Sequence, residues 1–358
     1  MELSRARIDD ILARYRAFYA ASRPGFMVRT TVSEAGWQLP ARQSLKGIEW
    51  GDRASARRFA AAHLAFMRAY WAHLPESGND WIPSISALLG TGAVAACLVR
   101  DARLNEEDNT NYLDPVIGDW PAGLERIGFD PDNPYYRTHV DVLRYWIEQW
   151  DGSFGLNPYS FFDPLDLANQ LRGNDLFYDF YDRPDALREL LETLTDELLA
   201  LARHLRSEVL AGYDIPGVCH TFWTPGEYLS CDAGDLSGPE VVTEWAVPYT
   251  GRLATALGGA YLHHHELGIH QILPWSRCPG ISAQVLNRDP NTPHLAQVVS
   301  DEHLRSTFDL PLGFIVTADE FRKSADYWAT GRCLLTVRCR DGVEAREIVD
   351  RVNQSYRV

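Results

Sequence analysis

The stretch GGAYLHHHELGIH, residues 258–270, decides the fold that we expect, because it joins a helix stop, a short strand and a histidine cluster. Two consecutive glycines end the preceding helix. Side chains alternate along a strand, so Leu262 and His264 face one side while His263 and His265 face the other. Two imidazoles one residue apart can converge on one point, as metal ligands do. The alternative is that these histidines are solvated or hydrogen-bonded polar residues.

Apolar strands alternate with helices downstream of this stretch. The expected strands are 281–286, 311–317 and 333–338, and the expected helices are 294–308, 318–330 and 343–352. This alternation indicates parallel strands that are buried on both faces. Four β/α units within roughly 100 residues correspond to half of an eight-stranded barrel. We therefore predict an α/β fold, a (β/α)8 TIM-type barrel with an N-terminal helical extension; a doubly wound open sheet is the alternative.

The first half of the chain contains helices and a long connection. Residues 27–36 form either a strand or an exposed ribbon, and residues 53–74 form an alanine-rich helix. Residues 105–136 are rich in Asp, Asn, Pro and Gly, with a short strand at Val116 and Ile117. An amphipathic N-terminal helix is expected to bury Ile8, Ile11, Leu12, Tyr15 and Phe18.

The clearest helix begins after Asp182, its expected N-cap, and ends before Gly212. Apolar residues at helical spacing between 187 and 209 form one face, which we expect in the core. A capping-box pattern, Ser237–Glu240, opens the helix that ends at Leu257.

The composition disfavours nucleic-acid and membrane partners. A formal net charge of −15 opposes binding to phosphates or to an anionic membrane surface. Six cysteines without a C-x-x-C pair give no disulfide framework, so we expect reduced thiols and a cytoplasmic location. Neither a signal peptide nor a span of roughly 20 apolar residues is expected. No linker divides the chain, and we predict one domain over residues 1–358, with 1–79 as the N-terminal extension.

Functional residues of a β/α barrel lie at the carboxyl ends of its strands. The residues at these ends are His263 and His265, Asn287 and Arg288, Thr317 and Asp319, and Arg338 to Asp341. Two neutral imidazoles and a thiolate with one open position form a catalytic zinc site. We therefore predict His263, His265 and Cys339 as metal ligands. The alternative for Cys339 is an inert small residue.

A polar and aromatic segment, 215–236, supplies further candidates. Asp232 is expected at the barrel mouth as a general acid or base, a ligand, or a clamp for a substrate hydroxyl or amine. A structural Asx-turn is the alternative for this residue. We predict Asp232 and His265 as catalytic residues. The predicted substrate-binding residues are His220, Trp223, Tyr228 and Asn157.

Three stretches resemble the uroporphyrinogen decarboxylase superfamily. They are DPLDLANQLRGNDLFYDFYDRPDALRELLETLTDEL (163–198), YLSCDAGDLSGPEVVTEWAVPYTGRLATALGGAYLHHH (228–265) and PGISAQVLNRDPN (279–291). The resemblance covers roughly residues 80–355 and is most specific between 154 and 290. It implies a β/α barrel with its site at the strand carboxyl ends, in agreement with the strand pattern.

The superfamily contains cofactor-independent decarboxylases and zinc-dependent methyltransferases, which move methyl groups between corrinoid proteins and thiols or other acceptors. In the methyltransferases an H-x-C motif follows the Gly-Gly stop, and a further cysteine lies near the last strand. His263 matches the motif histidine, His265 replaces its cysteine, and Cys339 lies near the expected last ligand. The decarboxylase branch carries an N-terminal Arg-Gln-Ala-Gly-Arg motif that is absent here, and 23–25 does not replace it. Porphyrinogen decarboxylation is therefore not expected.

The resemblance thus implies a zinc-dependent methyltransferase or demethylase acting on a small-molecule or corrinoid-bound substrate. A corrinoid protein would be the methyl donor, and the chain is expected to form a homodimer. One alternative is a metal-free or differently metallated decarboxylase or other lyase acting on a small carboxylated or polyhydroxylated compound, with the histidines as acid–base groups. The other alternative is a non-catalytic binding barrel.

Overall fold

The computed structural model describes most of the chain. The described residues are 4–21, 24–32, 38–73, 79–108, 110–118, 120, 122–158, 160–218, 222–290, 310–328 and 331–355. The expected helix at 294–308 lies outside them, as does His220.

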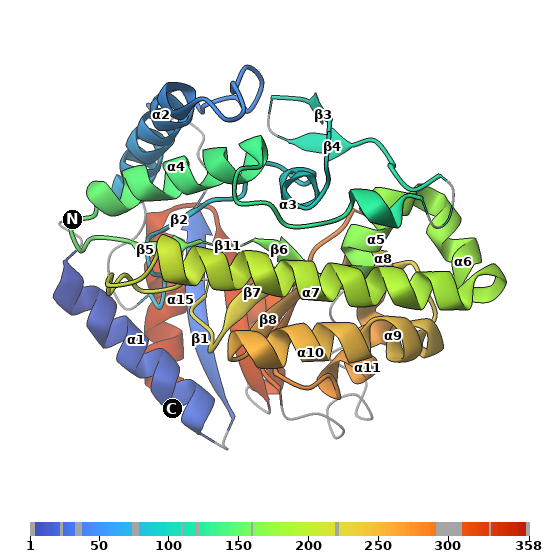
Figure 1. Cartoon of the computed structure of the whole chain (residues 1–358). Coiled ribbons are helices and arrows are strands. Elements are labelled where there is room, and N and C mark those ends of the chain that lie inside the picture. The colour runs from blue at the N-terminus through green and yellow to red at the C-terminus, as the bar shows by residue number, and fades with distance from the viewer. Residues whose placement is uncertain are drawn as a thin grey trace.

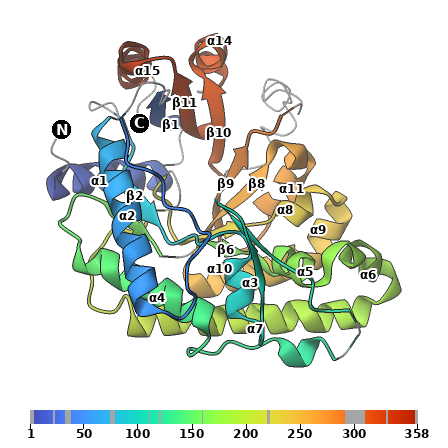
Figure 2. The ribbon, with the colours of Figure 1, turned by 90° about the horizontal axis from the view of Figure 1, so that it is seen from above.

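A curved sheet of seven parallel strands forms the centre of the molecule (Figures 1 and 2). Its order is β1-β11-β10-β9-β8-β7-β6, and every neighbouring pair is parallel. The strands are β1 (Gly25–Val32), β6 (Phe161–Phe162), β7 (Glu227–Ser230), β8 (Ala260–His265), β9 (Ile281–Asn287), β10 (Leu312–Thr317) and β11 (Arg332–Cys339). The strands expected from the apolar pattern after residue 258 are confirmed.

Two further parallel strands complete the ring. They are β2 (Ser84–Ser86) and β5 (Gly155–Asn157), which pair with each other, and β6 follows β5 closely in the chain. With β5 and β6 counted as one position, the ring has eight positions: β1, β2, β5/β6, β7, β8, β9, β10 and β11. The prediction of an α/β barrel of the TIM type is confirmed.

Side chains before β2 close the ring against β1. The amide of Val28 donates to Asp80 Oδ2 (2.8 Å), and the amide of Asp80 donates to the Val28 carbonyl (2.8 Å). One step along β1, the Thr30 amide donates to Asn79 Oδ1 (3.2 Å), whose Nδ2 donates to Thr30 Oγ1 (2.9 Å). Arg14 Nε donates to Asp80 Oδ1 at 2.9 Å. Two side chains thus take the place of a strand ladder at this seam.

Helices cover the outside of the sheet, and α7 and α10 lie side by side across it (Figure 1). The longer helices are α1 (Arg5–Ala20), α2 (Arg53–Ala72), α4 (Pro134–Glu148), α5 (Pro164–Arg172), α7 (Pro184–Glu208), α10 (Val247–Leu257), α14 (Ala318–Trp328) and α15 (Gly342–Ser355). The short ones are α3 (Ala93–Cys97), η1 (Leu124–Arg126), η2 (Gly173–Asp175), α6 (Leu176–Asp182), α8 (Asp232–Asp235), α9 (Pro239–Trp245), η3 (Glu266–Gln271) and α11 (Ile272–Ser276). No described helix is both long and apolar enough to cross a membrane.

The buried face of α1 closes the amino-terminal end of the barrel. Its five buried residues are the ones predicted from the sequence: Ile8, Ile11, Leu12, Tyr15 and Phe18. They form one cluster with inward-facing strand residues, among them Met27, Tyr261, Val285 and Leu334. The predicted apolar face of α7 is also buried. Helix α10 ends at Gly258, whose left-handed φ of 85° suits glycine.

Several local expectations are wrong. Asp182 belongs to α6, and Arg183 precedes α7 without a side-chain cap. The Ser237 hydroxyl donates back to the Ala233 carbonyl, so Gly238 takes the cap position of α9 and no capping box forms. The amides of Val116 and Ile117 both donate to the Leu171 carbonyl and join no sheet. The strands of that connection are β3 (Leu104–Glu106) and β4 (Asn111–Leu113), an antiparallel pair.

The segment 1–79 contributes β1 to the central sheet. This strand is the 27–36 segment, whose described part, 27–32, is a largely buried strand rather than an exposed ribbon.

The seam at Asp80 leads to a stability prediction. The Asp80→Ala variant leaves the Val28 amide and the Arg14 guanidinium without their carboxylate, so the free energy of unfolding should fall by about 3 kcal/mol. Asp80→Asn keeps one acceptor oxygen, so its free energy of unfolding should fall by less. Chemical denaturation measures both. Asp350→Ala on the exposed face of α15 is the control, expected within about 0.5 kcal/mol of wild type. An equal effect at both positions would contradict the structural role of Asp80.

Candidate functional site

Three side chains with metal-binding atoms meet at the carboxyl ends of two neighbouring strands. His263 and His265 are on β8, and Asp232 is the first residue of α8, just after β7. The parallel register pairs Ser230 with His263, which brings the end of β7 beside the two histidines. The alternation predicted for β8 holds, because His264 is fully buried whereas His263 and His265 are partly exposed.

The donor atoms are close enough for a shared ion. Asp232 Oδ1 lies 3.9 Å from His263 Nε2 and 3.7 Å from His265 Nε2. One ligand atom of each residue lies within 4.8 Å of the others, and the two imidazole rings are 5.1 Å apart at 79°. Bonds of about 2.0–2.1 Å in a tetrahedral zinc site separate neighbouring ligand atoms by about 3.4 Å. Two imidazoles and one carboxylate are a ligand set of catalytic zinc, so the residues fit this ion after a small inward movement.

Asp289 orients His265. Its Oδ1 lies 2.6 Å from His265 Nδ1, and its Oδ2 accepts from the Leu267 amide at 3.4 Å. With the Nδ1 proton held by a carboxylate, the Nε2 lone pair of His265 faces Asp232. Burial lowers the pKa of His265, but the hydrogen bond to Asp289 and the nearby carboxylates outweigh burial, and the net pKa is raised.

A buried carboxylate fixes the end of β8. Asp235 Oδ2 accepts from the His265 amide (2.6 Å), and Oδ1 lies 3.2 Å from His264 Nδ1. On its other side, His264 Nε2 lies 3.2 Å from Gln284 Oε1. A Cβ at Gly268 would lie 1.5 Å from Asp235 Oδ1, so this position has no room for a side chain.

A second carboxylate holds the backbone that carries Asp232. Asp166 accepts from the amides of Asp232 (2.9 Å) and Ala233 (2.6 Å). Asp163 caps α5 by accepting from the Asp166 amide (2.8 Å) and also accepts from the Thr250 hydroxyl (2.7 Å). Burial raises the pKa of Asp163 to about 6, and burial with two neighbouring carboxylates raises that of Asp166 well above its usual range. Both aspartates also lie near a buried cysteine, but their oxygens already accept hydrogen bonds and position Asp232.

Tyr228 and Asn157 lie at strand positions inside the barrel. The Tyr228 ring stacks on His263, with centroids 5.8 Å apart at 29°. Asn157 is buried, and its Nδ2 donates to Ser86 Oγ (3.2 Å) and Ser160 Oγ (3.1 Å). The structure thus brings Tyr228 to the histidines and places Asn157 in a hydroxyl network between β2 and β6.

Trp223 does not lie at this end of the barrel. It precedes β7 and packs against Tyr15 and Tyr19 of α1, with ring centroids 6.3 and 6.0 Å away. It lines a cavity of about 240 Å³ together with Tyr213 and Glu227. Because β7 begins at Glu227 and Asp232 follows its end, Trp223 and the histidines are at opposite ends of the strand.

Cys339 ends β11 as predicted but faces away from the histidines. Thr336 and Arg338 line a cavity inside the barrel, so alternation turns Cys339 outward. It packs in the apolar layer with Ala345 and Ile348 of α15. Burial raises its pKa to about 12, which opposes a thiolate. The structure therefore does not bring Cys339 to the histidines; among the described residues, Asp232 is the third group whose ligand atom lies close to theirs.

A cavity lies beside the histidines on the next strands. It has a volume of about 230 Å³ and is lined by residues of β1, β9, β10 and β11. The register of β8 with β9 pairs His263 with Val285 and His265 with Asn287, and both partners line this cavity.

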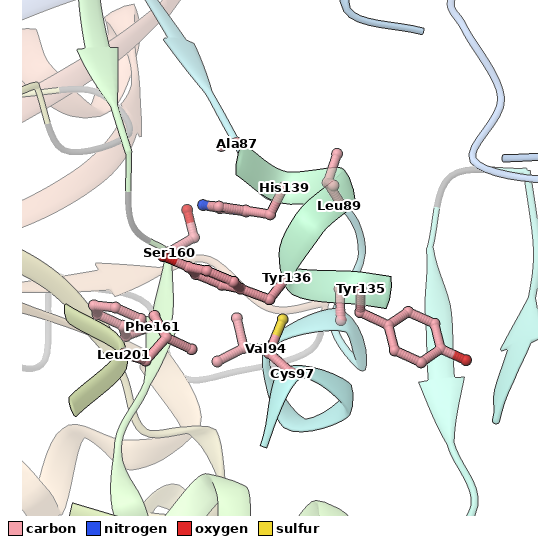
Figure 3. Close-up of a pocket in the computed structure, with 11 residues that line it drawn as sticks. Ala87, Leu89, Val94, Cys97, Tyr135, Tyr136, His139, Ser160, Phe161 and Leu201 are labelled. Atoms are coloured by element: carbon pink, nitrogen blue, oxygen red, sulfur yellow. The ribbon is translucent and has the colours of Figure 1, made fainter. Parts of the chain in front are cut away.

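A smaller cavity between α3, α4, β6 and α7 holds no comparable site (Figure 3). Its volume is about 20 Å³, which is room for about one water molecule. His139 Nε2 donates to the Pro158 carbonyl at 3.0 Å, and burial lowers its pKa to about 4. The ring is therefore a neutral, hydrogen-bonded part of the core.

The chain matches no protein-family model and no curated protein. Among solved structures, a methyltransferase from Methanosarcina mazei is similar with a TM-score of 0.57 and 11% identity, over 97% of this chain and 98% of that chain. The homocysteine methyltransferase MmuM from Escherichia coli, in its metallated form, matches with a TM-score of 0.23 and 11% identity, over 60% of this chain and 82% of that chain. At 11% identity the first likeness shows only a shared fold. The second likeness, with a TM-score of 0.23, is too weak to show even that.

The raised pKa of Asp163 predicts a pH dependence of stability. Between about pH 4 and pH 6 the native state binds more protons at this carboxyl than the unfolded chain, so the free energy of unfolding falls as the pH rises. Asp163→Asn keeps the acceptor for the Asp166 amide and removes the titration. Relative to wild type, its free energy of unfolding should rise by about 3 kcal/mol between pH 4 and pH 7. Denaturation of both proteins at several pH values measures this difference. A difference in the free energy of unfolding that stays constant from pH 4 to pH 7 would contradict the prediction.

Proposed function

We propose that this chain is a metal-dependent methyltransferase that binds zinc through His263, His265 and Asp232. The observation that carries the proposal is the convergence of these three side chains at the mouth of the barrel, with Asp289 holding the far nitrogen of His265. A histidine pair on one strand with a carboxylate-oriented ring is typical of metal sites. We assign the chain to the uroporphyrinogen decarboxylase superfamily on the sequence stretches described above. The whole-length likeness in fold to a methyltransferase supports this assignment.

Bound at this site, zinc would supply Lewis-acid chemistry and lower the pKa of an acceptor thiol or of water. The residues of the chain position the reaction. The Asp289 carboxylate keeps the His265 proton on Nδ1, and Asp235 fixes the strand backbone between the two histidines. Tyr228 forms an apolar wall against His263, and burial raises its pKa, which keeps its phenol neutral.

We further propose a corrinoid protein as the methyl donor and a thiol as the acceptor. Methyl transfer moves CH₃⁺ from cobalt to sulfur: the Co–C bond breaks, the S–C bond forms, the cobalt keeps the electron pair, and the thiol proton is released. The site differs from the thiolate-rich sites of the superfamily's methyltransferases, because nitrogen and oxygen atoms replace sulfur in the ligand set.

One observation favours a second candidate. The hydrogen-bonded Asp289–His265 pair beside the half-exposed Asp232 is also the arrangement of a general acid–base site. A metal-free lyase acting on a small acid would use this pair without zinc. Metal analysis separates the two candidates.

Purified wild-type protein should contain about one zinc per chain. His263→Ala/His265→Ala should lose it, whereas Asp289→Asn should weaken zinc binding about 10- to 100-fold, because the ring loses its orienting partner. Cys339→Ser is the matched control and should keep wild-type zinc. Elemental analysis and competition with a chelator measure these affinities. Wild-type protein that binds no divalent metal would favour the lyase.

Zinc-loaded protein should transfer the methyl group of a methylated corrinoid protein to an added thiol, and the absorbance of the corrinoid reports the loss of the Co–C bond. The His263→Ala/His265→Ala variant should be inactive, since the acceptor is no longer activated, and Cys339→Ser should match wild type. A metal-loaded protein that transfers no methyl group to a series of thiols would contradict methyl transfer.

A further inference from the structure

The cavity beside the histidines carries two arginines on its inner surface. Arg29 is on β1 and Arg338 is on β11. The register of these parallel strands pairs Arg29 with Thr336 and Thr31 with Arg338, so the two arginines are diagonal neighbours on one face. Both therefore point toward the same space.

Neither arginine is neutralised within the described residues. No ion pair in this part of the chain joins Arg29 or Arg338 to an acidic side chain, and Arg29 Nε is buried without a hydrogen-bond partner. Burial lowers the pKa of Arg29, and the nearby Tyr70, Tyr15 and Tyr261, together with a side-chain hydrogen bond to Tyr70, only partly oppose this shift. A desolvated guanidinium without a carboxylate is costly unless an anion binds to it.

The remaining polar groups of the cavity are donors as well. Thr31 and Thr336 supply hydroxyls, and Asn287 supplies a side-chain amide. No carboxylate of the described residues lines the cavity, whereas Asp232, Asp235 and Asp289 gather on the side of β7 to β9. The lining of this cavity is thus basic, whereas carboxylates surround the neighbouring histidines.

The volume of this cavity limits the size of the ligand that it can hold. About 230 Å³ lies below the range of about 300–1,000 Å³ for drug-sized ligands, so the cavity suits a small molecule. Two guanidinium groups with hydroxyl and amide donors match the geometry of a carboxylate. Because Val285 and Asn287 pair with His263 and His265, a molecule held here by its acid group extends toward the histidines.

We propose that this cavity binds the carboxylate of a small acid, and that this acid is the substrate of the site. The first half of the proposal is independent of the proposed function, and the second half rests on it. Arg29 and Arg338 hold the carboxylate, and the reacting group at the other end of the molecule, a thiol in the methyl-transfer reaction, faces His263 and His265.

The test compares two probes of equal length, 3-mercaptopropionate and 3-mercaptopropan-1-ol, by isothermal titration calorimetry on the zinc-loaded protein. The acid should bind about 10-fold or more tightly than the alcohol, because only the acid forms charge-assisted hydrogen bonds with the arginines. Arg29→Gln and Arg338→Gln should each remove most of this preference and leave the affinity for the alcohol unchanged. Arg203→Gln, an exposed position on α7, is the matched control and should keep the preference.

Circular dichroism checks the fold of Arg29→Gln, and the exposed Arg338 provides a variant that leaves the interior intact. Equal affinity for acid and alcohol in wild type, or an unchanged preference in the folded arginine variants, would overturn the proposal.

The same titration on the metal-free His263→Ala/His265→Ala variant separates this proposal from the proposed function. A preference for the acid that persists there supports the arginine site even if the protein transfers no methyl group. A preference that vanishes there while both arginines are intact would show that the metal site bound the carboxylate, and would overturn the assignment to Arg29 and Arg338.

Discussion

The position of the site depends on one four-residue helix, α8, which is fixed at both ends by carboxylates. At its start, Asp166 accepts from the amides of Asp232 and Ala233. At its end, Asp235 binds the His265 amide and the His264 ring. Asp232 and Asp235 are on the same short helix, and Asp235 binds the end of β8. The helix therefore holds the Asp232 carboxylate at a fixed distance from His263 and His265. The rest of the barrel supplies the parallel register that brings these strand ends together.

The sequence predicted the parts of the fold that follow from local periodicity. The β/α alternation after residue 258 gave the barrel, and strand alternation separated His264 from His263 and His265. Caps were predicted less well, because Asp182 is the last residue of the preceding helix α6 and the Ser237 hydroxyl donates back to the Ala233 carbonyl of α8. Barrel closure by Asn79 and Asp80 could not be predicted, since these side chains bond to a strand about 50 residues earlier.

The site residues that lie on a single strand, such as His263 and His265, were predicted from the sequence. The contacts between residues of neighbouring strands were not. Asp289 lies two residues after β9 and reaches His265 only through the parallel register, a relation that becomes visible once neighbouring strand ends are compared. Cys339 was placed at the correct end of its strand but on the wrong face, because the inward parity of β11 is set by its pairing with β1 and β10. Trp223 was predicted to bind substrate, although it precedes β7 and so lies at the opposite end of that strand from the histidines.

The seam between β1 and β2 has a consequence for motion. A strand ladder distributes its hydrogen bonds over many backbone groups, whereas this seam concentrates them in Asn79 and Asp80. Losing the Asp80 carboxylate would release several of these bonds at once, so we expect this seam to favour local opening. Arg29 lies on the strand that would move, directly between the two residues held at the seam, Val28 and Thr30. Local opening at this seam would therefore move the part of the barrel wall that carries Arg29.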